Sequence, residues 1–147
     1  MPKLYVMIGI SGCGKSTYSE KLNVPVVSSD AIRKELFGDE NDQGSPDKVF
    51  SLAYKRVREA LESGSDVVFD ATNVSFFARE SLLNAVKGIE CEKIGVVFPI
   101  TPKEALLRQV NRERKVPTDV INRQYRTLQR DIKISRCSLI ACSTYKT

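Results

Sequence analysis

The chain contains no histidine among its 147 residues, and this absence narrows the chemistry it can perform. A general base must then be a carboxylate or, less readily, a lysine or tyrosine. The four cysteines (Cys13, Cys91, Cys137 and Cys142) show no C-x-x-C spacing, so we expect reduced thiols and no zinc site. No apolar run approaches the ~20 residues that a membrane span requires. These absences predict a cytoplasmic protein that does not bind a membrane.

The positive charge of the chain is concentrated in one stretch. Between Lys103 and Arg136 there are ten lysines and arginines against four acidic residues, whereas the remainder carries thirteen against fourteen. Such a stretch is either a solvated helix face or a surface that binds polyanions. Charge alone leaves both alternatives open.

A glycine-rich motif lies near the start of the chain, where residues 9–16 read Gly-Ile-Ser-Gly-Cys-Gly-Lys-Ser, or G-x-x-x-x-G-K-S. An apolar run precedes it and a helical segment follows, which is the context of a phosphate-binding loop rather than of a chance glycine-rich turn. Its backbone N–H groups can face a phosphate, Lys15 would reach the β- and γ-phosphates, and the Ser16 hydroxyl would ligate Mg²⁺. We therefore expect ATP or another nucleoside triphosphate to be bound by Gly9, Ser11, Gly12, Cys13, Gly14, Lys15, Ser16 and Thr17.

The rest of the sequence alternates between predicted strands and helices. Strands are expected at 4–8, 24–29, 66–70, 93–98 and 138–142, and helices at 17–22, 31–37, 46–63, 75–87, 102–115 and 118–132. Together with the phosphate-binding motif, this order predicts a single α/β domain over 1–147: the three-layer sandwich of P-loop NTPases, with a mainly parallel sheet of four to five strands and a helical lid. Ser75 and Thr101 are expected to cap the helices that follow them, and Leu106, Leu107 and Val110 to face the core.

Asp30 follows the second predicted strand, and Arg33 lies three residues later on the same helix face. Ligands of parallel sheets bind beyond the carboxyl ends of the strands, so both side chains are expected near the phosphate loop. Asp30 suits a general base that accepts the proton of an acceptor hydroxyl, and the Arg33 fork suits an acceptor phosphate or hydroxyl. The alternative is that Asp30 or Ser29 only caps the helix, with Asp30 paired to Arg33.

Asp70 ends the third predicted strand at the same edge of the sheet. A carboxylate at this place in an NTPase often lies near Mg²⁺, and we expect Asp70 to reach the ion through a water. The alternative is that it caps the turn over 71–73. Thr72 and Asn73 either contact the acceptor or simply form that turn.

Three arginines and a lysine stand close together ahead of a Val-Pro break: Arg108, Arg112, Arg114 and Lys115. Arg108 and Arg112 are four apart and so face one way on a helix. A lid over approximately 106–118 can close on the triphosphate and place guanidinium groups on the charge that develops during transfer, with Arg112 also binding ATP. The alternative is a set of exposed, salt-bridged arginines.

Together these residues resemble the P-loop polynucleotide 5′-hydroxyl kinases, of the bacteriophage type and of bacterial RNA-repair proteins. The matching stretches span nearly the whole chain in order: Gly9-Ile-Ser-Gly-Cys-Gly-Lys-Ser16, Ser28-Ser-Asp-Ala-Ile-Arg33, Phe69-Asp-Ala-Thr-Asn73 and Arg108-Gln-Val-Asn-Arg-Glu-Arg-Lys-Val-Pro-Thr-Asp-Val-Ile121. The resemblance implies that Asp30 is the general base, that Arg33 binds the acceptor end, and that Arg108 and Arg112 are lid arginines. It also implies a phosphate donor without base selectivity.

The resulting hypothesis is a kinase that transfers the γ-phosphate of ATP to the 5′-hydroxyl of RNA or DNA, using Mg²⁺. The basic stretch makes a polyanionic acceptor reasonable, and no stable protein partner is evident. A bacterial or phage-infected cell is the expected setting. Two alternatives stay open: a kinase of a small metabolite, sugar or antibiotic, and a nucleotide-dependent switch without an acceptor.

Overall fold

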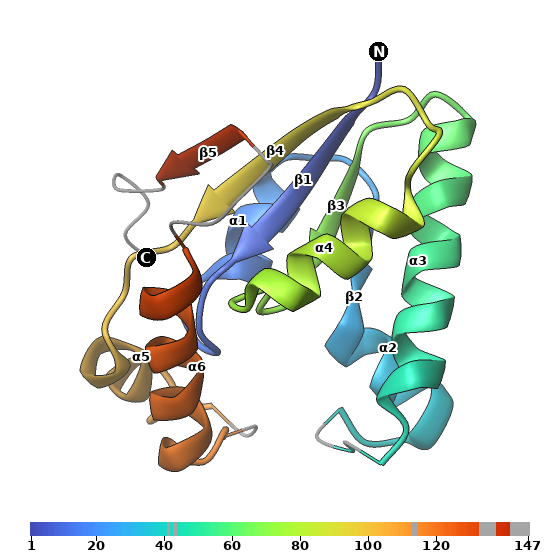
Figure 1. The fold of residues 1–147 in the computed structure, drawn as a ribbon. Helices are drawn as coiled ribbons and strands as arrows, with labels where there is room; N and C mark the ends of the chain where they lie inside the picture. Colours follow the sequence, from blue (N-terminus) through green and yellow to red (C-terminus); the bar gives the residue numbers. More distant parts are fainter. Residues whose placement is uncertain (41, 43, 113–114, 133–137, 142–147) are drawn as a thin grey trace.

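The computed structural model describes the chain except for residues 41, 43, 113–114, 133–137 and 142–147, and only the backbone of 138–141. One sheet of five parallel strands runs in the order β2-β3-β1-β4-β5 (Figure 1). The strands are β1 (Lys3–Ile8), β2 (Val26–Ser28), β3 (Val67–Asp70), β4 (Glu92–Val97) and β5 (Ser138–Ala141). The helices are α1 (Lys15–Lys21), α2 (Ser29–Phe37), α3 (Pro46–Glu62), α4 (Phe76–Ala85), α5 (Pro102–Arg108) and α6 (Thr118–Asp131). No helix within the described residues is both long and apolar enough to cross a bilayer.

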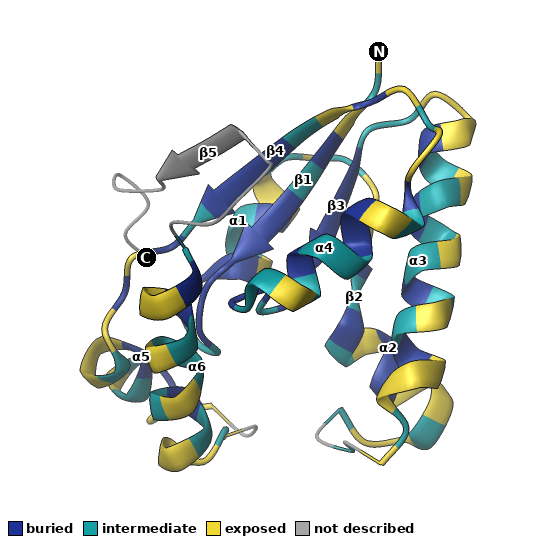
Figure 2. Ribbon diagram, viewed as in Figure 1, coloured by how far each residue is buried: buried dark blue, intermediate teal, exposed yellow. Residues whose placement is uncertain are grey.

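Helices cover both faces of the sheet, which produces three layers and buries the central strands (Figures 1 and 2). Alternate residues of β1 serve the two faces, as the period of a strand requires. Val6 packs in a core cluster that includes Val57 of α3, whereas Met7 packs in a second cluster with Ala105 of α5 and Ile121 of α6. The strands therefore read as continuous apolar runs because they are covered on both sides. The predicted α/β fold of P-loop NTPases is confirmed.

The carboxyl ends of the three neighbouring strands β2, β3 and β1 carry the residues expected to perform chemistry. Ile8 ends β1 and leads into the glycine-rich loop, which we call the phosphate loop (residues 9–16). In the register of β2 and β3, Ser28 lies opposite Asp70. Asp30, two residues beyond Ser28, is thus close to Asp70 at the same edge. This agrees with the expectation that the carboxyl ends of parallel strands, where ligands bind, share one edge of the sheet.

The helix caps show where local sequence rules held and where they did not. Ser75 and Thr101 cap as predicted, because their hydroxyls accept from the backbone N–H groups of Ala78 and Glu104. The cap of α2 is Ser28, which accepts from Ala31 N at 3.2 Å, so the expectation of Ser29 or Asp30 was wrong. The strand β2 ends earlier than predicted, and the helix begins at once after it. Asp30 is therefore inside the first turn of α2, and the cap explanation for this residue does not hold.

The prediction that Leu107 and Val110 face the core is wrong, since they are 65% and 57% exposed. The helix α5 ends at Arg108, so Val110 does not continue its helical face. The inward face is instead set by Ala105 and Gln109, which are buried, with Leu106 partly buried beside them. A two-turn helix has room for only one narrow buried stripe, and the apolar residues outside it remain in solvent.

Candidate active site

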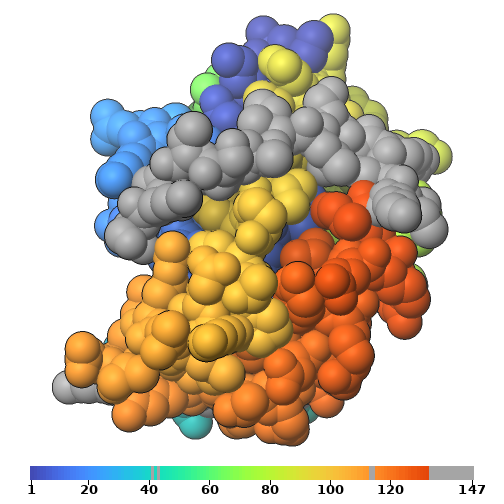
Figure 3. All heavy atoms as spheres, turned by 90° about the vertical axis from the view of Figure 1, so that its left-hand side faces the viewer, coloured from blue at the N-terminus to red at the C-terminus, as the bar shows by residue number. Residues whose placement is uncertain are grey.

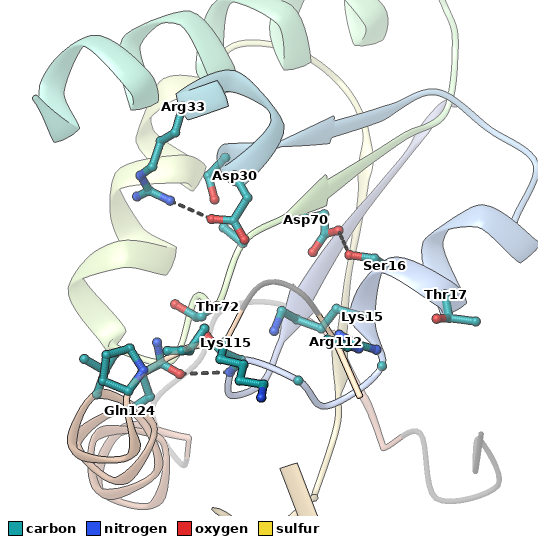
Figure 4. A pocket seen from close by; sticks show the side chains of 18 of the residues that line it. Lys15, Ser16, Thr17, Asp30, Arg33, Asp70, Thr72, Arg112, Lys115 and Gln124 are labelled. Atoms are coloured by element: carbon teal, nitrogen blue, oxygen red, sulfur yellow. Dashed lines mark hydrogen bonds and ion pairs between the residues drawn. The ribbon is translucent and has the colours of Figure 1, made fainter. Parts of the chain in front are cut away.

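A cavity of about 570 Å³ opens at the carboxyl ends of β1, β2 and β3. Its walls come from the phosphate loop, the start of α2, the residues after β3, residues 112 and 115–117, and α6 (Figure 4). The helices α5 and α6 form one lobe beside the sheet, as the view from their side shows (Figure 3). The segments that the sequence assigned to phosphate, acceptor and lid thus meet around one hollow.

The phosphate loop has the backbone that its glycines permit. Gly12 and Gly14 adopt φ values of 83° and 99°, which residues with a Cβ rarely adopt. A Cβ at Gly12 would also lie 3.2 Å from the carbonyl oxygen of Ala105, so the loop passes close against α5. Lys15 is the first residue of α1, and its Nζ donates to the carbonyl oxygens of Gly9 and Ile10 at 3.1 and 2.8 Å. The loop therefore places a cation and a helix N-terminus together, an arrangement suited to phosphate.

Ser16 and Asp70 place two oxygen-bearing side chains next to each other beside the phosphate loop. The Ser16 hydroxyl donates to Asp70 Oδ2 at 2.9 Å. Burial raises the pKa of the Asp70 carboxyl above its ordinary value, the charge of Lys15 and the Ser16 hydrogen bond oppose this, and Asp30 raises it further. A hydroxyl and a carboxylate are ligands that Mg²⁺ prefers, and a cation here would favour the ionised form of Asp70.

The protein supplies only part of such a coordination shell. Within the described residues there is no group of three or more histidine, cysteine, aspartate or glutamate side chains that could hold a metal ion by themselves. Mg²⁺ ordinarily keeps several waters and binds through one or two protein ligands together with substrate phosphates. The residues at Ser16 and Asp70 fit that mode of binding.

Asp30 and Arg33 face the same cavity as an ion pair (Figure 4). Arg33 Nη1 lies 2.9 Å from Asp30 Oδ1. The guanidinium carbon of Arg33 lies 5.7 Å from the ring centroid of Phe50, so one face of the group is covered by an aromatic ring. Arg33 is 8% exposed, and its Nε has no hydrogen-bond partner among the described residues. The pair therefore combines a carboxylate with a largely buried cation at the cavity wall.

The two residues after Ala71 have different surroundings. Thr72 lines the cavity. Asn73 does not: it is 3% exposed, and its Nδ2 donates to the carbonyl oxygens of Met7 and Ala71 at 2.8 and 3.3 Å. Asn73 also adopts a φ of 49°, which suits a turn residue. The structure supports the turn-forming alternative for Asn73 and leaves Thr72 as the candidate for contact with an acceptor.

The proposed lid residues also differ from one another. Arg112 and Lys115 line the cavity, whereas Arg114 lies outside the described residues. Arg108 does not line the cavity; its Nη1 donates to the carbonyl oxygen of Cys13 at 3.2 Å. Arg108 and Arg112 are four residues apart, but they do not lie on one helix face, because α5 ends at Arg108.

Two further residues expected to bind the nucleotide do not line the cavity, Gly9 and Cys13. The N–H of Gly9 donates instead to the carbonyl oxygen of Thr72 at 2.9 Å. The Cys13 side chain is buried, and its burial raises the pKa of the thiol, against a smaller opposing effect of Lys15. Gly9 and Cys13 therefore contribute to the shape of the loop on the side that does not face the cavity.

The polar and aromatic residues Phe50, Arg123 and Gln124 line the cavity but were not assigned to the site from the sequence. A signal for the last two was present, because they lie beside Ile121 and Leu128, two apolar residues at helical spacing that are buried in α6. Residues beside a core stripe lie at the rim of whatever that helix covers. Nothing in the local sequence distinguished Phe50.

The cavity wall is rich in cationic side chains. Its described residues include five cations and two carboxylates, the cations being Lys15, Arg33, Arg112, Lys115 and Arg123. Three of the five come from the basic stretch after Lys103. Part of the positive excess therefore faces the cavity, where it suits a strongly anionic ligand.

Comparison with known proteins agrees with this geometry. The AAA_33 family, described as an AAA domain, matches residues 4–131. The L-seryl-tRNA(Sec) kinase of Methanococcus maripaludis is 24% identical over 131 residues, which cover 83% of this chain and 51% of that protein. A chain in the structure of the Pnkp1/Rnl/Hen1 RNA repair complex superposes with a TM-score of 0.82 at 22% identity, covering 99% of this chain and 50% of that one.

A gluconokinase from Sinorhizobium meliloti 1021 superposes with a TM-score of 0.59 at 19% identity, covering 98% of this chain and 85% of that one. The chain thus spans about half the length of the tRNA kinase and of the RNA-repair protein that it matches, but most of the length of the gluconokinase. These likenesses to solved structures establish the fold.

Proposed function

The chain belongs to the AAA_33 family of AAA domains and has a P-loop kinase-like fold, and we propose that it transfers the γ-phosphate of ATP to the 5′-hydroxyl of RNA or DNA. One observation carries the proposal: the Asp30–Arg33 pair lines the same cavity as Lys15, Ser16 and Asp70. A switch that only hydrolyses its nucleotide has no need of a second, acceptor-binding pair.

The chemistry is a direct transfer. The acceptor oxygen forms a bond to the γ-phosphorus while the bond from that phosphorus to the β,γ-bridging oxygen breaks, and ADP leaves. Asp30 takes the proton of the acceptor hydroxyl, since the chain has no histidine to do so. Lys15, the loop amides and Arg112 stabilise the charge on the transferred group. Mg²⁺ held by Ser16, with Asp70 through a water, would neutralise the β- and γ-phosphate oxygens.

A nucleic acid is the acceptor that the cationic wall favours. Arg33 lines the cavity beside the proposed base, and its guanidinium suits a phosphate adjoining the reacting hydroxyl. Lys115, which precedes α6, and Arg123 of α6 add to the positive charge of the cavity wall. The printed names of two similar proteins, a tRNA kinase and an RNA repair complex, concern RNA.

A sugar or another small metabolite is the second candidate acceptor. The observation that favours it is length, because the chain covers 85% of the gluconokinase but only half of the two RNA-associated proteins. A small acceptor that carries at most one charge, however, does not require five cations on the cavity wall. The absence of a stable protein partner stays a prediction, since the RNA repair protein was solved in a complex.

The test is an acceptor screen with ATP labelled at the γ-phosphate. The acceptors are 5′-hydroxyl oligonucleotides of RNA and DNA, a nucleoside 3′-monophosphate, a free nucleoside and gluconate, with Lys15→Ala as the inactive control. We expect labelling of the oligonucleotides, weakened by salt with a log–log slope of about −0.7 per phosphate contacted on a single strand. Labelling of gluconate alone, indifferent to salt, would replace the polynucleotide kinase with the small-molecule kinase.

A further inference from the structure

Gln124 of α6 is joined to the phosphate loop across 113 positions of sequence. Its Oε1 accepts a hydrogen bond from the backbone N–H of Ser11 at 2.8 Å (Figure 4). A backbone N–H can only donate, so this contact determines which end of the side-chain amide is the oxygen. The Nε2 end carries two N–H donors and has no hydrogen-bond partner in the part of the chain that the structure describes. Gln124 thus brings an unused neutral donor to the cavity wall.

The backbone N–H of Ser11, which was expected to face a phosphate, donates to Gln124 instead, so this part of the loop does not offer that donor to the donor phosphates. Those phosphates belong at the N-terminus of α1, which begins at Lys15, whereas Ser11 is in the first half of the loop. Thr72 is tied to that same first half, since Gly9 N donates to its carbonyl oxygen at 2.9 Å. In Figure 4, Gln124 and Thr72 are drawn on the side of the cavity away from Thr17. Gln124 therefore lies on the acceptor side.

The neighbouring groups show what Gln124 can add. Five cations already line the cavity, and Arg33 is suited to an acceptor phosphate. A neutral amide donor contributes no charge. It strengthens the binding of a ligand that places a hydrogen-bond acceptor opposite it and weakens the binding of a ligand that leaves the donor unpaired. The oxygens next to a reacting sugar hydroxyl are such neutral acceptors.

We propose that Gln124 is a specificity-determining residue for the acceptor, whose Nε2 donates to a sugar oxygen adjoining the hydroxyl that is phosphorylated. The Ser11 contact holds the amide in the required orientation. The proposal rests on the proposed phosphotransferase function, because it places an acceptor opposite Asp30. The same oxygen chemistry is offered by the terminal nucleoside of a nucleic acid and by a free sugar acid.

A purely structural role for Gln124 predicts a different outcome from acceptor recognition. Gln124→Glu retains an oxygen that accepts from Ser11 N but has no N–H to donate, whereas Gln124→Ala removes both functions. If Gln124 only anchors the loop, Gln124→Ala weakens ATP binding and Gln124→Glu does not. If Gln124 recognises the acceptor, both variants lose acceptor affinity. Gln129→Ala is the matched control, since Gln129 is exposed on the same helix and does not line the cavity.

The experiment measures KM for ATP and KM for the acceptor in the wild type and the three variants, with a 5′-hydroxyl oligonucleotide and with gluconate. We expect both Gln124 variants to raise the acceptor KM about tenfold, the loss typical of one hydrogen bond. We expect KM for ATP to change less than about threefold, and Gln129→Ala to match the wild type.

The outcomes separate this inference from the proposed function. Transfer to the oligonucleotide with an unchanged acceptor KM in both Gln124 variants would overturn the inference and leave the function in place. Transfer to gluconate alone, with the acceptor KM raised in both variants, would overturn the polynucleotide function and support the role of Gln124. A rise in KM for ATP confined to Gln124→Ala would make the residue a loop anchor, and transfer to neither acceptor would overturn both proposals.

Discussion

Arg108 donates a hydrogen bond to the carbonyl oxygen of Cys13 at 3.2 Å, across 95 positions of sequence. In a trans peptide the C=O and the following N–H point in opposite directions. With the Cys13 carbonyl turned toward α5, the N–H of Gly14 points away from α5, on the side of the loop that faces the cavity. Arg108 is therefore placed to orient the Gly14 amide, which we propose binds phosphate, without contacting the phosphates itself.

We predict that Arg108→Ala weakens ATP binding more than it slows transfer. The variant loses the group that holds the Cys13–Gly14 peptide, and one hydrogen bond from a charged donor corresponds to roughly a tenfold change in affinity. Calorimetric titration with a non-hydrolysable ATP analogue measures the affinity, and single-turnover kinetics measures the transfer rate. Arg126→Ala is the control, since Arg126 is exposed and does not line the cavity. An unchanged affinity would mean that the loop holds its shape without Arg108.

Arg112→Ala should have the opposite balance of effects. Arg112 lines the cavity, and a guanidinium there acts most strongly on the charge that develops as the phosphoryl group moves. We expect transfer to slow by ~10²-fold while ATP affinity falls by much less. Calorimetric titration and single-turnover kinetics measure the two effects. Equal losses of ATP affinity and of transfer rate would mean that Arg112 acts mainly in binding ATP before the reaction.

Asp30→Asn should remove transfer and spare ATP binding. The amide can still accept from Arg33, but it cannot take a proton, and the triphosphate is held by other residues. Loss of a general base typically costs ~10²- to 10⁴-fold in rate. Single-turnover transfer and nucleotide affinity are measured together. A variant that loses nucleotide affinity as severely as transfer would point to a structural or metal-linked role for Asp30.

A buried arginine ties the turn after β3 to the end of α6. Arg79 is 2% exposed, and its guanidinium donates to the carbonyl oxygens of Asn73, Val74 and Asp131. The Asp131 carboxylate in turn accepts from Phe76 N at 2.9 Å. These contacts fix the C-terminal end of the helix that carries Gln124 relative to the strand end that carries Asp70.

We predict that Asp131→Ala lowers the melting temperature at pH 7 by an amount that decreases in acid. Hydrogen bonds from Arg130 and from Phe76 N lower the pKa of Asp131 from 3.8 to about 2. Because the folded pKa lies below the unfolded one, the stabilisation is complete above pH 3.8 and is lost as the pH falls toward about 2. Thermal melts of both proteins between pH 7 and pH 2.5, roughly spanning that window, measure it. A difference that does not vary with pH would indicate lost packing instead.

The sequence by itself determined those features that depend on residues close together in the chain. The glycines and lysine of the phosphate loop and the caps at Ser75 and Thr101 are each specified within a few residues. The strand-end rule added one longer-range result, since the carboxyl ends of parallel strands share an edge. Applied to the sequence alone, that rule predicts that Asp30 and Asp70 lie at the same edge of the sheet.

Only the tertiary structure decided which side chains reach the cavity from elements far apart in sequence. Arg108 and Arg112 look equivalent as a spaced pair, yet one contacts the phosphate loop and the other lines the cavity, because α5 ends between them. Phe50 and Gln124 enter the site through the packing of α3 and α6, and Asn73 turns inward because the carbonyl oxygen of Met7 is within reach. Such placements depend on how whole elements pack against the sheet, which no local pattern of residues encodes.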